Sequence, residues 1–244
     1  DLFAAVRPIK IPEKNIDWCF FRENIEGEYI WGNKGIQVND DLAIDFKVQT
    51  KQGSERIARA AFEYARKNGK HNVTAITKAN IVKLADGNFL KAVHHIGETE
   101  YPDVEIEDLL VDNTAMQLIN RPADFDVVVT ENMFGDILSD EAAQITGSLG
   151  MLASASLGDG TALYEPSHGS APDIAGKGIA NPLAQILSVE MMLRYSFDMA
   201  AEADAIERAV DKTLRSGFRC GDIMQENCQL VGCKAMGAEI RSRI

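Results

Sequence analysis

The sequence has few of the features that would set it apart from an ordinary globular protein. Cysteine is scarce: the 244 residues include four, and none stands in a CxxC pair or at zinc-ligand spacing with a histidine. This pattern favours free thiols over a metal or disulfide framework. Free thiols are typical of a reducing compartment, so we expect a cytoplasmic protein.

Positive charge is also in short supply. Lysine and arginine number 25 against 37 acidic residues, which gives a net charge of −12 at pH 7. Nucleic acids and anionic membranes are bound through clustered Lys and Arg, so we expect neither as a partner. No apolar run approaches the roughly 20 residues that cross a bilayer, and no signal peptide is visible. A small anionic substrate remains possible, because a few Arg and Lys in a cleft suffice to bind one.

Two further features are missing. No GxGxxG follows a predicted strand, so the usual dinucleotide fingerprint is absent. The nearest substitute is the glycine-rich stretch 168–178, whose backbone N–H groups could cradle a nucleotide. The chain also begins at Asp1 without a methionine, within what looks like a continuing segment, and we expect it not to be a complete translation product.

What the sequence does contain is an alternation of apolar runs and helical patterns, which is typical of the α/β class. The predicted strands are 16–21, 42–49, 72–77, 104–111, 125–130 and 163–166. The predicted helices are 53–67, 87–96, 114–120, 134–145, 182–197, 202–216 and 233–244. Ser54 is the expected N-cap of the first helix, strand 42–49 is expected to be an arm used in dimerisation, and 147–160 is expected to be irregular.

Two carboxylates stand one helical turn apart directly after a predicted buried strand. Apolar residues from Phe134 onwards recur at helical spacing, which puts Asp136 and Asp140 on one face of a helix, close enough to bind one cation. Acids in the first turn of a helix are also favoured by the helix dipole alone, and two carboxylates do not define a metal site. The pair by itself leaves both interpretations open.

Other polar residues stand near predicted strand ends, where α/β proteins place their sites. Arg7, Arg22 and Tyr29 could bind and protonate a carboxylate-bearing substrate, because the guanidinium fork matches a carboxylate. Lys78 could be a base, and Asp112 a metal ligand. Each has an ordinary alternative: a structural ion pair for the arginines, a solvated side chain for Lys78, and a helix N-cap for Asp112.

In combination these residues resemble a known family, the β-decarboxylating dehydrogenases of 2-hydroxy acids, which include isocitrate and 3-isopropylmalate dehydrogenases. The resemblance covers essentially the whole chain, in the family's order. The motifs that carry it are Arg22-Glu23-Asn24 followed by Tyr29, Lys78-Ala79-Asn80, Asp112-Asn113, Asn132-Met133-Phe134-Gly135-Asp136 with Asp140, and His168-Gly169-Ser170-Ala171-Pro172-Asp173.

The resemblance implies the family's fold, two α/β domains with a dimerisation arm. Residues 3–146 would form the small domain, which carries the arm and the metal and substrate residues. Residues 147–244 would form the C-terminal half of the large, NAD-binding domain. Family members begin with on the order of a hundred further residues, so the first half of the large domain is expected to be missing, and with it the loop that reads the substrate's side group.

The resemblance also implies a reaction. A hydroxyl carbon gives a hydride to a nicotinamide, and CO₂ then leaves the β-carbon while a divalent metal acts as electron sink. In the family pattern Arg7 and Arg22 hold the substrate carboxylates. Tyr29 and Lys78 also touch the substrate: Lys78 accepts the hydroxyl proton, and Tyr29 protonates the enolate carbon.

Metal binding in the family pattern requires two subunits. Asp136 and Asp140 of one subunit and Asp112 of its neighbour would hold Mg²⁺ or Mn²⁺, which prefer hard oxygen ligands. Lys78 would also come from the neighbour. The resemblance therefore implies a homodimer or a higher homo-oligomer.

The expected nicotinamide cofactor is NAD. Asp173 matches the position that binds the adenosine ribose in NAD-using members, and a carboxylate there would repel the 2′-phosphate of NADP. Members that use NADP tend to have Lys and Tyr where this chain has Asp173 and Ile174. The residues that the resemblance implies for cofactor binding are Asn80, His168, Gly169, Ser170, Ala171, Asp173, Ile174 and Asn181.

Different stretches of the chain indicate different substrates. Residues 132–188 and 217–222 look like the members that oxidise 3-isopropylmalate in leucine biosynthesis, whereas 22–29 and 84–89 look more like those that oxidise isocitrate in the tricarboxylic acid cycle. We expect 3-isopropylmalate, with isocitrate as the alternative and tartrate or D-malate after it. A non-catalytic regulatory subunit is a further alternative, but such subunits usually lose some of the Tyr, Lys and Asp residues that are all present here.

Overall fold

The structure is a computed structural model that describes residues 1–11 and 14–244. The chain divides into two compact units, each of which is considered by itself: the first unit is residues 1–142 with 156–161, and the second unit is residues 143–155 with 162–244. The sequence prediction placed its boundary after residue 146 and assigned 156–161 to the second part. The domain roles that we expect from the sequence stay predictions.

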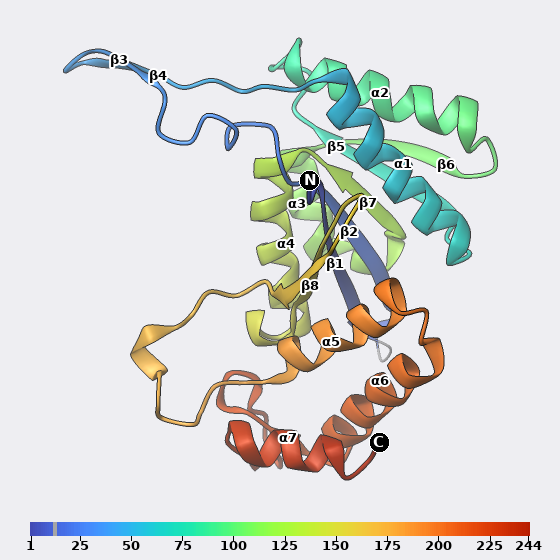
Figure 1. Cartoon of the computed structure of the whole chain (residues 1–244), viewed down its shortest axis with the longest axis vertical. Coiled ribbons are helices and arrows are strands. Elements are labelled where there is room, and N and C mark those ends of the chain that lie inside the picture. Colours follow the sequence, from blue (N-terminus) through green and yellow to red (C-terminus); the bar gives the residue numbers. More distant parts are fainter. Residues whose placement is uncertain (12–13) are drawn as a thin grey trace. The chain divides into compact units, whose positions relative to one another are not determined.

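The first unit is built on a mostly parallel sheet, with strand order β6-β5-β7-β2-β1 (Figure 1). Strands β2, β7, β5 and β6 run parallel to their neighbours, and β1 is antiparallel to β2. Residues Val127 to Val129 of β7 are fully buried, as expected for a strand covered on both faces. The strand bounds are β1 (Ala4–Ile11), β2 (Ile16–Glu23), β5 (Asn72–Thr77), β6 (Glu105–Leu110) and β7 (Val127–Thr130).

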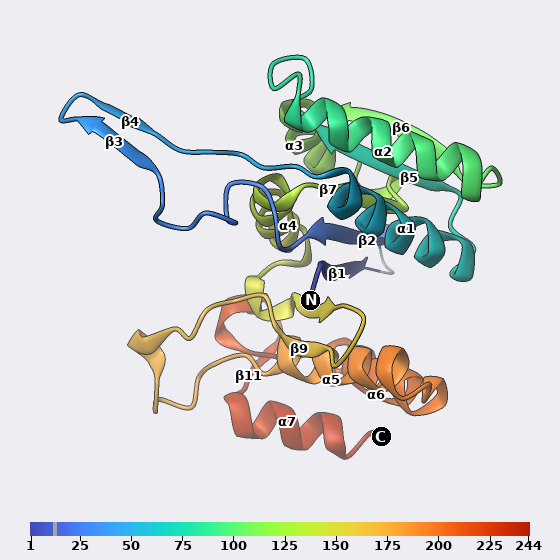
Figure 2. The ribbon, with the colours of Figure 1, turned by 45° about the horizontal axis from the view of Figure 1, so that its top comes forward.

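Helices cover both faces of this sheet, which confirms the predicted α/β class. Helices α1 and α2 lie side by side over one face, and α3 and the start of α4 lie over the other (Figure 2). The bounds are α1 (Lys51–Lys67), α2 (Ala85–Glu100), α3 (Val111–Asn120), the 3₁₀ turn η2 (Pro122–Asp124) and α4 (Asn132–Thr146).

The predicted N-cap of α1 is wrong. Thr50, in extended conformation, accepts a hydrogen bond from Gly53 N at 3.0 Å and is the true cap. Ser54 is buried one turn inside the helix, where its hydroxyl donates to Thr50 O at 2.8 Å. The helix therefore begins at Lys51, before the predicted start at 53.

An arm leaves the first unit between β2 and α1. It is the hairpin of β3 (Ile36–Asn39) and β4 (Leu42–Ile44), drawn in light blue in Figures 1 and 2. Every residue of both strands is exposed, including Ile36, Val38 and Leu42. The predicted strand 42–49 is thus shorter than expected and lacks a buried face in this chain. Beyond Ile44 the backbone is irregular, apart from an isolated bridge between Val48 and Gly27.

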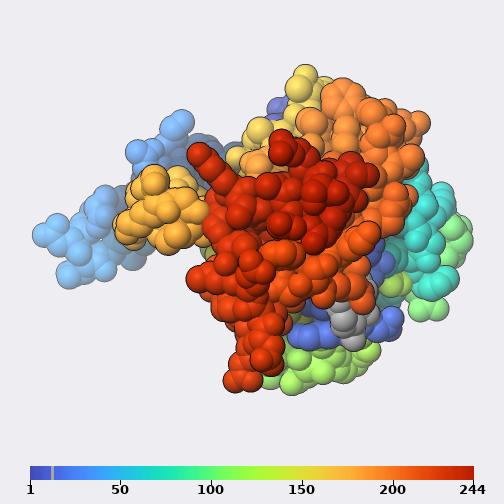
Figure 3. All heavy atoms as spheres, turned by 90° about the horizontal axis from the view of Figure 1, so that it is seen from below, coloured from blue at the N-terminus to red at the C-terminus, as the bar shows by residue number. Residues whose placement is uncertain are grey.

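The second unit has its own apolar core between helices α5, α6 and α7. Helix α7 lies on the face of this unit that is turned to the viewer in Figure 3, in red. The core residues are Leu183, Ala209, Val210, Cys220, Met236 and Ile240. The elements after α4 are η3 (Leu149–Met151), β8 (Ala153–Leu157), β9 (Leu163–Pro166), η4 (Pro172–Ile174), α5 (Leu183–Ser196), α6 (Ala200–Arg215), β10 (Phe218–Arg219), η5 (Gly221–Ile223), β11 (Gln229–Leu230) and α7 (Cys233–Arg241).

The prediction that 147–160 is irregular is wrong for its centre, where strand β8 forms. Ala153 and Ala155 are buried strand residues whose small side chains gave no apolar signal in the sequence. Among the described residues, none of the helices combines the length and the apolar character needed to cross a membrane.

Candidate active site

The first turns of α4 meet the end of β2 in the first unit. Helix α4 begins directly after β7, and Arg22 of β2 is paired with Thr130 of β7 across the parallel ladder. Gly135 makes the close approach possible: a Cβ there would lie 2.7 Å from the Cβ of Arg22 and closer still to the Thr130 hydroxyl. The strand end thereby brings an arginine against the helix that carries Asp136 and Asp140.

Arg22 is held in place by two residues of α4. Its Nε and Nη2 donate to Asn132 Oδ1 at 3.0 and 2.6 Å, and its Nη1 donates to Asp136 Oδ1. Asn132 is fixed in turn, because its amide donates to the carbonyl of Glu26 at 2.9 Å. The guanidinium, which is almost fully buried, is therefore fixed in orientation before any ligand arrives.

Arg7 adds a second buried guanidinium to the same place. Its Nη1 donates to the Ser139 hydroxyl and lies 3.7 Å from Asp140 Oδ1. Its Nη2 lies 3.7 Å from Asp136 Oδ1. Burial and the neighbouring Arg22 lower the pKa of Arg7, although the two carboxylates act to raise it. Two guanidiniums thus face two carboxylates.

Tyr29 completes this cluster. Its hydroxyl donates to Asp136 Oδ2 at 3.1 Å, and the Arg22 guanidinium carbon lies 5.4 Å from its ring centre. Partial burial and the Asp136 carboxylate raise the pKa of Tyr29, so the phenol keeps its proton at neutral pH. We call Arg7, Arg22, Tyr29, Asp136 and Asp140 the arginine–aspartate cluster.

Asp140 differs from Asp136 in its surroundings. Partial burial raises the pKa of Asp140; Arg7 acts to lower it and the Asp136 carboxylate to raise it further. Two carboxylates on one helix face form a place where an added cation is favoured. The oxygen donors of the pair suit a hard divalent ion, but such an ion needs more ligands than these two side chains supply.

Lys78 and Asp112 form a separate ion pair. Lys78 follows β5, Asp112 lies in the first turn of α3, and the Lys78 ammonium donates to Asp112 Oδ1. This hydrogen bond lowers the pKa of the exposed Asp112 carboxyl. The alternative of Asp112 as an N-cap is wrong, because Leu110 holds the cap position and Asp112 stands inside the helix.

The described part of the chain does not bring all three predicted metal ligands together. No three His, Cys, Asp or Glu side chains of residues 1–11 and 14–244 form a group that could hold a metal ion. One chain thus supplies Asp136 and Asp140 in one cluster and Asp112 in another. A complete set needs further donors, and the prediction that a second subunit supplies them stays a prediction.

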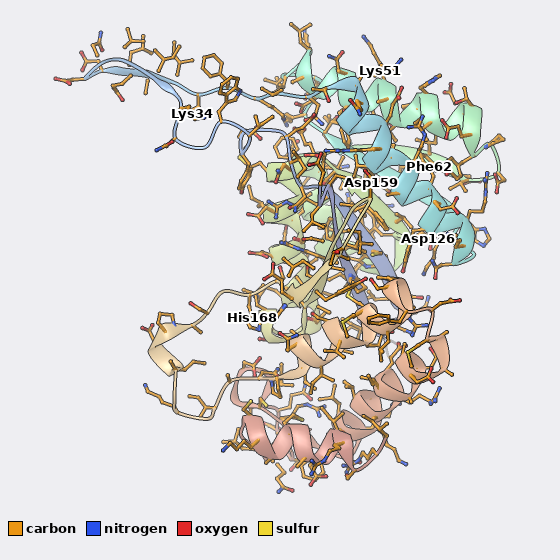
Figure 4. All side chains as sticks on the ribbon, in the orientation of Figure 1. Lys34, Lys51, Phe62, Asp126, Asp159 and His168 are labelled. Carbon is orange, nitrogen blue, oxygen red and sulfur yellow. The ribbon has the colours of Figure 1, made fainter. Side chains whose placement is uncertain are left out.

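Most of the predicted cofactor residues lie in the second unit. His168 stands where the extended segment between β9 and α5 begins (Figure 4), and its Nδ1 lies 2.8 Å from the Gly169 carbonyl. Ala171 has a positive φ of 45°, which turns the chain into η4 at Asp173 and Ile174. Gly169, Ser170 and Asp173 are exposed. Their backbone is therefore open to a ligand.

Asn181 is the most constrained of these residues. Its amide donates to Asp222 Oδ2 at 3.0 Å, and its oxygen accepts from Leu183 N at 3.0 Å. Asn80, by contrast, lies in the first unit, two residues after Lys78, and is exposed.

Sequence reasoning assigned no role to Asn132 or Ser139, although each binds a site arginine. Ser139 lies three residues after Asp136 and one before Asp140, and that spacing places it on the same helix face. Asn132 carries no such signal, because its partner Arg22 is remote in sequence.

The chain is similar in sequence and in structure to known dehydrogenases. A sequence model of the isocitrate/isopropylmalate dehydrogenase family matches residues 1–240. The 3-isopropylmalate dehydrogenase of Aquifex aeolicus is 46% identical over 255 residues, 98% of this chain and 69% of that protein. The Pseudomonas putida enzyme of the same name is 50% identical over 97% of this chain and 69% of its own length. The crystal structure of isocitrate dehydrogenase from Methylococcus capsulatus superposes with a TM-score of 0.91 at 41% identity, over 99% of this chain and 73% of that one.

Proposed function

This chain belongs to the isocitrate/isopropylmalate dehydrogenase family and is a β-decarboxylating dehydrogenase; from this premise we propose that it oxidises and decarboxylates 3-isopropylmalate with NAD. The observation that carries the proposal is the arginine–aspartate cluster, in which two carboxylate-binding groups, a protonated phenol and two potential metal ligands meet. The relatives named for 3-isopropylmalate, at 46% and 50% identity, favour this substrate.

Arg7 and Arg22 bind the substrate carboxylates in this proposal. Both guanidiniums are buried and positioned by Ser139 and Asn132, so little side-chain freedom is lost on binding. A substrate with two carboxylates matches two adjacent guanidiniums, because each planar fork can bind one carboxylate in bidentate fashion.

Tyr29 acts as the acid that protonates the carbon left after CO₂ departs. Its raised pKa keeps the proton available, and its hydrogen bond to Asp136 aims the phenol into the cluster. The raised pKa thus matches the role of an acid better than that of a base.

Lys78 accepts the hydroxyl proton as the hydride leaves. In the isolated chain it pairs with Asp112, outside the arginine–aspartate cluster. We propose a homodimer in which Lys78 of the partner subunit and Asp112 of the partner subunit complete each site. Asp136, Asp140 and Asp112 of the partner subunit would hold Mg²⁺ or Mn²⁺, which as a Lewis acid stabilises negative charge on the substrate oxygen.

The choice of NAD rests on charge. The exposed carboxylate of Asp173 stands in the glycine-rich segment that we assign to the adenosine moiety. It would accept a hydrogen bond from a ribose hydroxyl and repel a 2′-phosphate. Asn181, held by Asp222, is assigned to the adenine.

The test is a parallel assay of the full-length protein with 3-isopropylmalate, isocitrate and D-malate, each with NAD and with NADP. We expect NADH formation with 3-isopropylmalate, and an at least tenfold lower kcat/KM with the other substrates and with NADP. A preference for NADP would refute the Asp173 argument. Absence of turnover with every substrate would favour a non-catalytic subunit of the family.

Isocitrate is the second candidate substrate. It is favoured by the similarity to the Methylococcus capsulatus isocitrate dehydrogenase, at 41% identity. The stretch that contains Arg22 and Tyr29 also looks more like isocitrate-oxidising members. Higher kcat/KM with isocitrate than with 3-isopropylmalate in the same assay would decide for it.

A further inference from the structure

Lys47 is a largely buried lysine at the base of the arm that has no part in the reaction described above. We propose that Lys47 is a positioning residue, which ties the segment that carries Lys78 to the helix that carries Asp136 by binding Asp86 and Glu131. The inference deepens the proposed function and rests on it, because it concerns the placement of the same catalytic groups. We call Lys47, Asp86 and Glu131 the Lys47 node.

The contacts of the Lys47 ammonium are short and enclosed. It lies 2.6 Å from Asp86 Oδ1, forms an ion pair with Glu131, and lies 3.7 Å from Glu28 Oε1. The ring centre of Phe134 lies 4.7 Å away. The Lys47 side chain is 13% exposed and those of Asp86 and Glu131 are fully buried, so solvent barely screens these contacts.

Asp86 connects the node to Lys78. One carboxylate oxygen of Asp86 binds Lys47, and the other accepts a hydrogen bond from the backbone N–H of Lys78 at 2.7 Å. Only the Asp86 side chain thus lies between the Lys47 ammonium and the backbone N–H of Lys78, the proposed base. Any shift of Asp86 would move that backbone directly.

Glu131 connects the node to the start of α4. It immediately precedes Asn132, which holds Arg22, and its carbonyl accepts from Gly135 N at 3.0 Å. The node therefore fixes the first turn of the helix that carries Asp136 and Asp140.

The arm reaches the node through its backbone as well. Val48, next to Lys47, exchanges hydrogen bonds of 3.1 and 2.8 Å with Gly27, two residues before Tyr29. The Lys47 ammonium thus connects four parts of the first unit: the base of the arm, the segment 27–29 that ends at Tyr29, helix α4, and the segment that carries Lys78. In the proposed dimer Lys78 serves one site and Asp136 the other, so the node lies between groups of two different sites.

Charge makes Lys47 difficult to replace. Three carboxyl groups surround one ammonium group, and burial raises the pKa of Glu131 to about 8 against the lowering effect of Lys47. Lys47 is thus the cation that both fully buried side chains, Asp86 and Glu131, contact. A neutral residue at position 47 would leave the Asp86 carboxylate buried without a counter-ion.

The test compares three variants of the full-length protein with the wild type. Lys47→Met removes the ammonium. Lys47→Met/Asp86→Asn also removes the buried carboxylate charge, so this variant keeps the inference testable if the single variant fails to fold. Lys51→Met is the matched control, because Lys51 is 80% exposed at the start of α1 (Figure 4) and pairs only with Glu55 among the described side chains.

We expect both Lys47 variants to lose about tenfold or more in kcat, since displaced catalytic groups lose rate. KM for NAD should stay within about twofold, and hydrogen exchange of the Lys78 amide should accelerate. Lys51→Met should match the wild type. A folded double variant with wild-type kcat and wild-type exchange would overturn the inference. If the wild type turns over no substrate, the proposed function fails, and unchanged exchange at Lys78 would separately refute the tie through Asp86.

Discussion

Three members of the arginine–aspartate cluster approach the Asp136 carboxylate: Arg22, Arg7 and Tyr29. Such convergence fixes two guanidiniums and a phenol around one acid without a bound ligand. Preorganisation of this kind lowers the entropy cost of binding, and each group can be tested alone.

Tyr29→Phe removes the acidic proton and keeps the ring beside Arg22. Because no other phenol contacts Asp136 among the described residues, we expect kcat to fall by about 10²- to 10⁴-fold, with KM for the substrate changed only a few-fold. Steady-state kinetics measures this. Tyr164→Phe, which removes a hydroxyl that pairs with Ser196, is the control and should leave kcat unchanged. An equal kcat in both variants would remove Tyr29 from the mechanism.

Glu131→Gln should change how stability depends on pH. Burial raises the pKa of Glu131 to about 8 from an ordinary value of 4.5, so the folded state holds the proton more tightly than the unfolded chain. The resulting stabilisation is complete below about pH 4.5 and is lost as the pH rises through about 8. The free energy of unfolding of the wild type should therefore fall relative to the variant by on the order of 1–3 kcal/mol between pH 5 and pH 8. Urea unfolding of both proteins at each pH measures the difference, and parallel curves would contradict it.

Single residues were predictable where the partner is near in sequence. Asp136 and Asp140 share a helix face by spacing alone, and the structure has them there. Lys47 and Asn132 gave no such signal, because their partners come from other elements and only the folded sheet brings them together. The role of each predicted residue still depends on the experiments above.

At the scale of elements, the first turn of α4 requires glycine at position 135, because a larger residue has no room there. Gly135→Ala would place a methyl group 2.7 Å from the Arg22 Cβ, against a buried strand that cannot yield. We expect a loss of about 1–3 kcal/mol in unfolding free energy and a raised KM for the substrate, because Arg22 must shift.

The matched control is Gly87→Ala in α2, where a Cβ meets nothing within 4 Å. It should be neutral or stabilise by about 0.4–1 kcal/mol. Thermal unfolding and steady-state kinetics of both variants show whether the effect at position 135 comes from the close approach of α4 to β2 or from replacing any helical glycine by alanine. Equal stability of the two would contradict the packing argument.

Element types followed from the sequence more readily than element ends. Periodicity predicted α1, β5 and α4, all of which form. The start of α1 was wrong because Thr50, outside the apolar pattern, caps it. Strand β8 was missed because alanine and serine carry no strong strand signal.

At the scale of the whole molecule, the arginine–aspartate cluster and the Lys78–Asp112 pair stand apart in one chain. If two copies share each site, two inactive variants should complement each other. Asp136→Asn and Asp112→Asn are each expected to lose at least about a hundredfold in metal-dependent kcat. Mixed by unfolding and refolding, they should regain about a quarter of wild-type activity, because half the dimers are mixed and each has one intact site. Mixing Asp136→Asn with Asp140→Asn, both from the same cluster, is the control and should regain nothing; recovery there, or none in the first mixture, would refute shared sites.

The hairpin of β3 and β4 has a consequence for the life of a newly made chain. Its apolar residues, among them Val38 and Ile44, are exposed on a strand pair that no other described residue covers. Such a surface is a starting point for aggregation and for protease attack. If the hairpin is the predicted dimerisation arm, an unpaired subunit would be cut first within residues 30–46, and the rate of that cleavage would measure the pool of unassembled chains.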